Sequence, residues 1–234
     1  MKVAWGDERL RQVLSACVTL GFAVGVFAIS FGVSAVAAGA TVAQTCAMSL
    51  LVFTGASQFS AVSVLGSGGS AASAFGGAAL LAARNGVYGL AMAPHLGSGL
   101  GSRLVAAQLT IDESTAMALT QEDEHHRRAA FWVTGVSVYL FWNVGTLVGA
   151  LLGQAIDPKV WGLDAAFPAA FVAMVWPLLR ERRSALAALI GATVCLVLIP
   201  FTAVGVPILC ATVGVLVGVP PQHRPIRRAA QGPA

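Results

Sequence analysis

The sequence has very few charged residues. Asp, Glu, Lys and Arg together make up 10% of the 234 residues, against about 25% in an ordinary soluble domain. Hydrophobic residues make up 57%. This composition excludes an ordinary soluble domain and predicts a polytopic membrane protein.

The apolar runs also lack the dyad alternation of polar and apolar side chains that marks the strands of a membrane barrel. They are about 20 residues long, the length a helix needs to cross the hydrocarbon core. The 26 glycines suit helices that pack closely through small residues. We therefore predict an all-α fold, a polytopic membrane helical bundle of seven to eight spans.

Motifs of membrane enzymes and of nucleotide-driven pumps are absent. The sequence contains no Gly-x-Ser-x-Gly elbow, no His-Glu-x-x-His motif and no P-loop. The four cysteines lie in apolar segments without Cys-x-x-Cys or metal spacing. We expect no enzymatic activity, no cofactor and no metal site. The net charge of +4 comes from residues between apolar runs, which are topology signals and not a nucleic-acid-binding face.

The distribution of apolar segments divides the chain into three parts. We expect a basic cytoplasmic N-terminus at 1–12, a transmembrane transporter domain at 13–219, and a Pro-rich, basic, disordered tail at 220–234. Residues 121–128 are predicted to form a solvated loop. The spans are expected at about 13–38, 45–65, 72–93, 129–153, 165–179 and 185–201, with a last one ending near 219.

Segment 95–120 leaves the number of spans open. It has a helical apolar pattern but contains Arg103, Asp112 and Glu113. It could lie at the interface, re-enter the membrane, or cross it as a broken helix. A crossing would give eight spans and place most Lys and Arg on one side, with Lys159 and Arg103 opposite. The positive-inside rule therefore favours eight spans with both ends cytoplasmic.

Two pairs of features suggest an internal duplication. The Gly55–Phe59 interruption of one span has a possible counterpart in the Leu163–Pro168 run. The glycines of the first span likewise have counterparts in the glycines of the 129–153 span. Transporters built from two repeats bind substrate where interrupted helices of both halves meet. We expect two structural repeats of this kind. The glycines concerned are Gly21 and Gly25 in the first set and Gly145, Gly149 and Gly153 in the second.

The Gly55–Phe59 run is a candidate binding element. A break in a membrane helix frees backbone N–H and C=O groups, which can bind the carboxylate and ammonium of a zwitterion. Ser57 and Gln58 would add side-chain donors and acceptors at the same depth. In the alternative interpretation, Gly55 and Ser57 only allow close packing, and Gln58 makes an interhelical hydrogen bond.

Arg84 is a second candidate. A charge at membrane depth costs roughly 2.5 to 3.5 kcal/mol on insertion scales, so it persists where it faces a protein interior or a wet cavity. Tyr88 is four residues away and shares its helix face. The guanidinium could hold a substrate carboxylate, or it could form an ion pair with Asp112, Glu113 or Asp164.

The acidic residues also have two interpretations. Asp112 and Glu113 are adjacent, so on a helix they point about 100° apart and are not expected to face the same cavity. One could carry a coupling proton, or the two could form an interfacial acidic pair. Asp164 could take part in the site, or it could favour the positive end of a helix with Pro168 in the first turn.

Four stretches of the sequence carry a family resemblance: LLVFTGASQFSAVSVL, ARNGVYGLAMAP, LTIDESTAMAL and GLDAAFPAAF. They resemble the AzlC family, the large subunit of bacterial branched-chain amino acid exporters. Ala82 and Asn85 stand where many members have Asn and His. The resemblance implies a substrate site at Gly55, Ala56, Ser57, Gln58, Phe59, Arg84, Tyr88, Asp164 and Pro168, with Asp112 and Glu113 for proton coupling.

By this resemblance the chain would be a multi-pass protein of the bacterial cytoplasmic membrane that exports branched-chain amino acids. It would work with a small AzlD-like membrane subunit. With no P-loop in the sequence, we expect a secondary transporter driven by the proton motive force. The alternatives are a non-transporting scaffold or sensor subunit and a passive channel.

Overall fold

The computed structural model describes residues 8–97, 99–155, 172, 176, 178–202, 206–214 and 216. Within this part of the chain every regular element is a helix, so the all-α prediction is confirmed. Asp164, Pro168 and the predicted tail 220–234 lie outside the described residues. So does most of the predicted 165–179 span.

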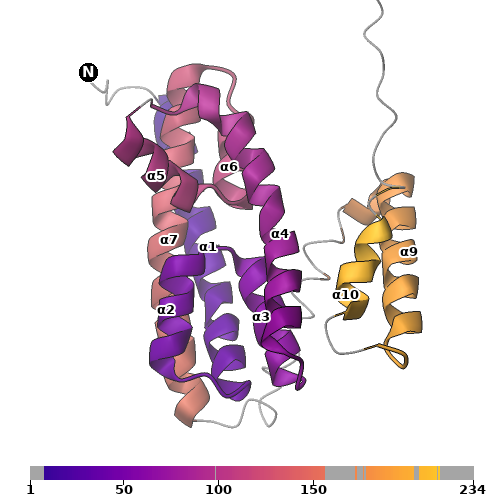
Figure 1. Cartoon of the computed structure of the whole chain (residues 1–234). Coiled ribbons are helices and arrows are strands. Elements are labelled where there is room, and N and C mark those ends of the chain that lie inside the picture. The colour runs from indigo at the N-terminus through magenta and orange to yellow at the C-terminus, as the bar shows by residue number, and fades with distance from the viewer. Residues whose placement is uncertain are drawn as a thin grey trace, which may run out of the picture.

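Two long helices form the centre of the bundle, α1 (Glu8–Ala37) and α7 (Glu124–Ala155) (Figure 1). In the described part of the chain they are the two helices long and apolar enough to cross a membrane. α4 (Ala71–Met92) is also long enough, at 22 residues, but Arg84 and Asn85 lower its mean hydropathy. The structure does not confirm the predicted count of seven to eight spans, because segments counted in it fold back, as described below.

Helices α1 and α7 run parallel and touch through glycines. Gly25 faces Gly145 and Gly149 faces Ile29, and a Cβ on either α7 glycine would overlap a backbone carbonyl of α1. Small residues allow this approach, and in lipid close packing replaces the hydrophobic effect between helices. The two glycine sets that suggested a duplication are therefore the two sides of one helix–helix contact.

The predicted 45–65 span is a folded-back pair of short helices, α2 (Val42–Val52) and α3 (Gly55–Gly66). The end of α3 returns beside the end of α1, because a Cβ on Gly66 would lie 3.0 Å from the Cβ of Ala38. Gln58 of α3 also reaches the carbonyl of Met48 in α2. The prediction that this segment crosses as one interrupted rod is therefore wrong. An apolar segment of this length can either cross the membrane or fold back within it.

The interruption lies slightly earlier than predicted. The chain reverses at Phe53 and Thr54, and Thr54 has the extended backbone of an N-cap residue, with φ −152° and ψ 99°. Thr is a favoured residue at that position. The Gly55–Phe59 run is thus the first turn of α3 and not the break itself.

Segment 95–120 forms a second hairpin, made of α5 (Leu100–Leu109) and α6 (Asp112–Leu119). It follows the short η1 (Ala93–His95) at one end of the bundle. It leaves at the same end, because His95 Nδ1 lies 2.9 Å from Glu124 Oε2 and Arg128 Nε donates to the His95 carbonyl. Of the three alternatives, the structure shows re-entry. The preference for a crossing here, and for eight spans on that basis, is wrong.

The two hairpins approach from opposite ends of the bundle (Figure 1). The α2–α3 pair follows α1, and the α5–α6 pair follows α4, which runs antiparallel to α1. Two helix–hairpin units of opposite direction therefore succeed each other. The second interruption in the described residues is at Thr110–Ile111, and the one predicted at 163–168 lies outside them.

The predicted loop 121–128 is partly helical. α7 begins at Glu124, and the Asp123 carboxylate accepts a 2.9 Å hydrogen bond from the His126 amide N–H. This bond and a second one with the His126 side chain lower the pKa of Asp123 from 3.8 to about 2. Asp123 is therefore ionised at neutral pH, where its charge favours the positive N-terminus of α7.

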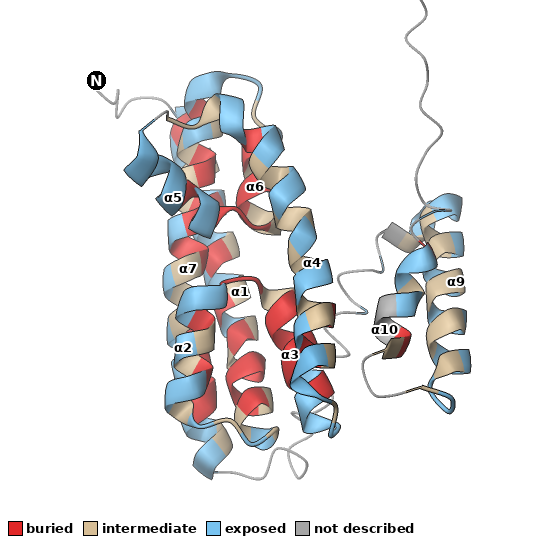
Figure 2. Ribbon diagram, in the orientation of Figure 1, coloured by how far each residue is buried: buried red, intermediate tan, exposed pale blue. Residues whose placement is uncertain are grey.

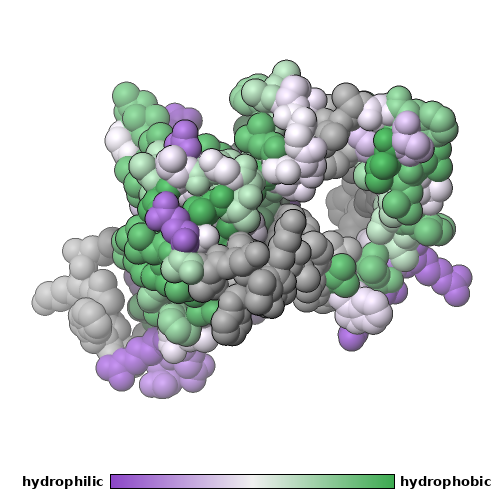
Figure 3. Space-filling view, turned by 90° about the horizontal axis from the view of Figure 1, so that it is seen from below, coloured by the Kyte–Doolittle hydropathy of each residue, from purple (hydrophilic) through white to green (hydrophobic). Residues whose placement is uncertain are grey.

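Buried residues gather where α1, α3, α6 and α7 meet (Figure 2). The C-terminal helices α9 (Arg182–Leu198) and α10 (Val206–Ala211) pack against each other, and α10 also contacts α4. No residue of α9 is buried. Hydrophobic side chains cover much of the visible surface, with hydrophilic ones in separate patches (Figure 3). Such a surface suits contact with lipid.

Candidate functional site

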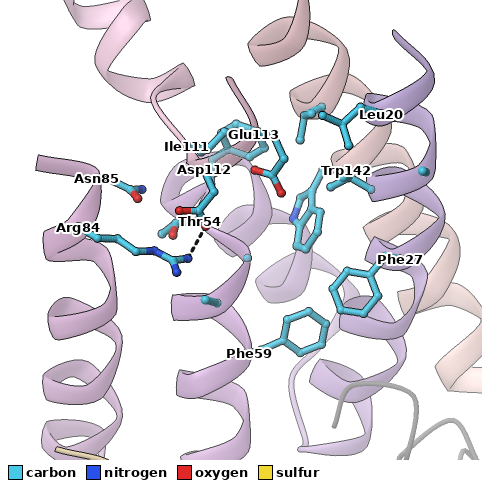
Figure 4. Close-up of a pocket in the computed structure, with 16 residues that line it drawn as sticks. Leu20, Phe27, Thr54, Phe59, Arg84, Asn85, Ile111, Asp112, Glu113 and Trp142 are labelled. Atoms are coloured by element: carbon cyan, nitrogen blue, oxygen red, sulfur yellow. Dashed lines mark ion pairs between the residues drawn. The ribbon is translucent and has the colours of Figure 1, made fainter. Parts of the chain in front are cut away.

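A cavity of about 490 Å³ lies where the two hairpin turns meet α1, α4 and α7 (Figure 4). Its size falls in the range of small-molecule sites, roughly 300 to 1,000 Å³. The polar lining comes from the hairpin turns, α4 and α6, and the apolar lining mainly from α1, α3 and α7. The lining residues are Leu20, Ala23, Val24, Phe27, Phe53, Thr54, Gly55, Ala56, Phe59, Arg84, Asn85, Ile111, Asp112, Glu113, Val138 and Trp142.

An ion pair joins α4 to the tip of the second hairpin. Arg84 Nη2 lies 2.7 Å from Asp112 Oδ2, and the two side chains are 37% and 33% exposed. Arg84 Nε and Asn85 Oδ1 are buried without a hydrogen-bond partner. A buried polar group left unpaired costs about 1 to 3 kcal/mol. A bound water or a polar ligand in the cavity would remove this cost.

The N-terminus of α3 adds positive electrostatic potential beside Arg84. Thr54 makes no side-chain hydrogen bond to the α3 backbone, so the first-turn N–H groups of α3 are not capped by it. Uncapped amides and the helix dipole favour a negative group at this position. Thr54, Gly55 and Ala56 all line the cavity. The guanidinium and this helix end thus lie on one polar side of the site.

Asp112 and Glu113 both face the cavity, contrary to the expectation from their spacing. They form the first turn of α6, directly after the hairpin turn, and both carboxyl groups open into the same space. Figure 4 shows Asp112 turned to Arg84 and Glu113 extending toward Trp142. In the described part of the chain, no cation lies within ion-pairing distance of Glu113. Its carboxyl group can therefore take a proton or a substrate ammonium.

The opposite side of the cavity is aromatic. The ring centroids of Phe27 and Phe59 are 5.3 Å apart, and those of Phe59 and Trp142 are 6.4 Å apart in an edge-to-face arrangement. Phe31 packs behind them, against both Phe59 and Trp142. Edge-to-face pairs are favourable contacts. The site thus has a charged side and an apolar side.

Three of the predicted binding residues that the structure describes do not line the cavity: Ser57, Gln58 and Tyr88. Gln58 is fully buried, and its Nε2 donates to the Met48 carbonyl at 3.0 Å while its Oε1 accepts from Trp142 Nε1 at 3.1 Å. Ser57 is also buried. Gln58 therefore makes the interhelical hydrogen bond of the alternative interpretation, and it positions a cavity residue.

The aromatic side of the cavity leaves space only for glycine at position 55. A Cβ at this position would lie 2.9 Å from Cη2 of Trp142, and hydrogen bonding to Gln58 restrains the ring.

Tyr88 does not line the cavity. It lies one turn beyond Arg84 on α4, where its hydroxyl interacts with the Asp112 carboxyl group. Tyr88 is thus in contact with the ion pair and not with the cavity itself.

Several cavity residues were not anticipated from the sequence. Phe27, Val138 and Trp142 lie within long apolar runs, where nothing separates a lining side chain from one facing lipid. Thr54 and Asn85 are polar residues in apolar segments, and this could have marked them.

Substituting Gln58 with leucine is expected to destabilise the protein by about 1 to 3 kcal/mol, because the Met48 carbonyl and the Trp142 N–H lose their shared partner. Thermal unfolding in detergent would measure the change. Gln108→Leu is a matched control, because Gln108 donates a hydrogen bond to the Leu50 carbonyl at an exposed position. An equal shift for both variants would show that the Gln58 bridge has no special role.

Comparison with known proteins assigns the family. The family model described as AzlC protein matches residues 19–156, more than half of the chain. This chain belongs to the AzlC family. The match spans both hairpins, α4 and every cavity residue from Leu20 to Trp142. No curated protein and no solved structure matches the chain.

Membership confirms the resemblance seen in the sequence. The AzlC family is membrane-associated and is linked in general to branched-chain amino acid transport. Together with the two long apolar helices, this identifies the AzlC chain as a membrane protein. The match to the family model ends at residue 156, so α9 and α10 lie outside it.

Proposed function

We propose that this chain is a secondary transporter that exports branched-chain amino acids across the bacterial cytoplasmic membrane. It is the large subunit of a two-component exporter and works with a small AzlD-like membrane subunit. The observation that carries the proposal is the cavity at the meeting point of two oppositely directed hairpins, with charged groups on one side and aromatic rings on the other.

The lining groups match the three parts of a branched-chain amino acid. The substrate carboxylate pairs with Arg84 and the N-terminus of α3, since guanidinium–carboxylate bonds are strong and directional. The ammonium pairs with Glu113. The aliphatic side chain lies among Phe27, Phe59 and Trp142. One methylene changes binding by about 1 to 3 kcal/mol in such a pocket, so several related amino acids are expected substrates.

The Arg84–Asp112 pair gives the site a coupling mechanism. It joins α4 to the second hairpin, so a substrate carboxylate that competes for Arg84 loosens this connection. Protonation of Asp112 has the same effect, because a neutral carboxyl group holds the guanidinium less strongly. Proton binding and substrate binding therefore act on one contact between two structural elements. A proton-driven exporter also requires that proton and substrate exclude each other, and Glu113 meets this requirement because its carboxyl group holds either a proton or the substrate ammonium.

The distribution of positive charge supports an orientation in which one end of the bundle faces the cytoplasm. Arg9, Arg11, Arg127 and Arg128 belong to the end where α1 and α7 begin, and Arg103 is carried by α5, which starts there too. At the opposite end, the described residues 38–41, 66–70 and 153–155 include no Lys or Arg. By the positive-inside rule the first end is cytoplasmic. Arg103 is then on the cytoplasmic side, and not opposite as predicted.

Export from dipeptide-fed cells tests the function. Cells that express this chain with its partner are expected to release leucine and valine and to keep lower internal levels of both. Proteoliposomes are expected to move leucine uphill only with a proton gradient. Unchanged internal levels would favour a scaffold or sensor, and equal flux with and without the gradient would favour a passive channel. Either outcome would contradict the proposal.

A further inference from the structure

An open depression lies on the outer face of α1 near its N-terminal end, and the described residues that line it all belong to this one helix. It has a volume of about 830 Å³ and is more open than the central cavity. Five polar residues of α1 line it at helical spacing: Glu8, Arg11, Gln12, Ser15 and Thr19. Residues three and four apart share a helix face, so these side chains form one continuous stripe, which we call the α1 groove.

The polar stripe is unusual for its helix. α1 is one of the two helices apolar enough to cross a membrane, and Ser15 and Thr19 lie a turn or more inside it, exposed. Polar groups on a lipid-facing surface are costly and are found mainly where they face protein or water. The exposed residue Val18 points about 100° away from Thr19 and is apolar, and beyond Thr19 the stripe's own side of the helix continues with the exposed apolar residues Phe22 and Val26. The polar stripe therefore ends at Thr19 and marks only the first part of α1 as wet.

The α1 groove is continuous with the central cavity. Leu20 and Ala23 line both hollows. They lie immediately beyond Thr19, at the inner end of the stripe. Figure 4 places Leu20 at the margin of the cavity, on the side of Glu113. A molecule that follows the stripe inward thus arrives at the free carboxyl group.

We propose that the α1 groove is the vestibule through which a zwitterionic amino acid reaches the cavity from the cytoplasmic end. This inference rests on the proposed function. Arg11 and Glu8 at the mouth offer one charge of each sign, which suits a zwitterion. Gln12, Ser15 and Thr19 supply uncharged donors and acceptors along the path. Leu20 and Ala23 form an apolar contact between the α1 groove and the aromatic side of the cavity.

Thiol labelling tests this path. In a chain with Cys46, Cys195 and Cys210 replaced by serine, Ser15→Cys and Thr19→Cys are compared with Val18→Cys. Cys17 is retained because it is fully buried. The reagent is a membrane-impermeant methanethiosulfonate added to the cytoplasmic side of inverted vesicles. Cysteines at 15 and 19 are expected to react several-fold faster than at 18. Leucine should slow the reaction at 19, and labelling there should block export.

The possible outcomes separate this inference from the proposed function. Equal labelling at 18 and 19, or full export after position 19 is labelled, would contradict the vestibule alone. Protection of position 19 by the partner subunit and not by leucine would show that the groove is a subunit interface, which also overturns the vestibule. Absence of export by the unlabelled variants, with the native chain equally inactive, would contradict both proposals.

Discussion

Replacing Arg84 with alanine is expected to remove export of leucine and valine while the chain still inserts in the membrane. Arg84 has two partners in the account, the Asp112 carboxylate at 2.7 Å and the substrate carboxylate. Hydrogen bonds to charged groups are worth about 1.5 to 3 kcal/mol, so loss of the substrate contact predicts a roughly 10- to 150-fold fall in affinity. Export assays in dipeptide-fed cells, with membrane content measured by immunoblot, would show this.

Control variants separate the charge of Arg84 from its geometry. Arg84→Lys keeps the charge but loses the planar fork that binds a carboxylate at two points, so partial export is expected. Arg103→Ala removes an exposed cation of α5 that does not line the cavity, and export is expected to stay normal. Normal export by Arg84→Ala would exclude this residue from the substrate site.

Replacing Gly149 with leucine is expected to prevent the bundle from folding. A Cβ at this position would already overlap the Ile29 carbonyl of α1, so the leucine has no space unless α1 and α7 separate. Overpacking a core costs about 1 to 3 kcal/mol when side chains can adjust. Here the clash is with backbone, and we expect a larger loss. Size-exclusion chromatography of detergent extracts would measure the yield of folded protein.

Two further glycine variants sharpen this test. Gly149→Ala is also expected to destabilise the protein, because the first added carbon meets the backbone. Gly101→Leu is the matched control, because a Cβ on this α5 glycine would have nothing within 4 Å. Comparable yields for Gly149→Leu and Gly101→Leu would show that the α1–α7 contact is not needed for folding.

Some of the fold follows directly from the sequence. Composition and run length predict the all-α fold, and the predicted limits 72–93 differ by one residue at each end from α4. One of the two interpretations of Arg84 was an ion pair with Asp112, Glu113 or Asp164, and Asp112 is its partner in the structure. These features depend on local hydropathy or on the cost of a charge in lipid, both of which a sequence records.

The two hairpins could not be predicted from local hydropathy or from the cost of a charge in lipid. A run of about 20 apolar residues satisfies the length criterion whether it crosses or folds back, and hydropathy is the same in both cases. The decisive contacts are long-range, such as that of Gly66 with Ala38 and that of His95 with Glu124. The same holds for Gln58, whose partner Trp142 is 84 positions away.

Binding of leucine to the purified chain with its partner subunit tests the central claim most directly. Saturable binding of radiolabelled leucine is expected, with strong loss in Arg84→Ala. 4-Methylpentanoate, which lacks the ammonium, and 3-methylbutylamine, which lacks the carboxylate, are expected to compete weakly. Unchanged binding by Arg84→Ala, or competition by both compounds equal to that of leucine, would contradict a cavity that recognises both charges of a zwitterion.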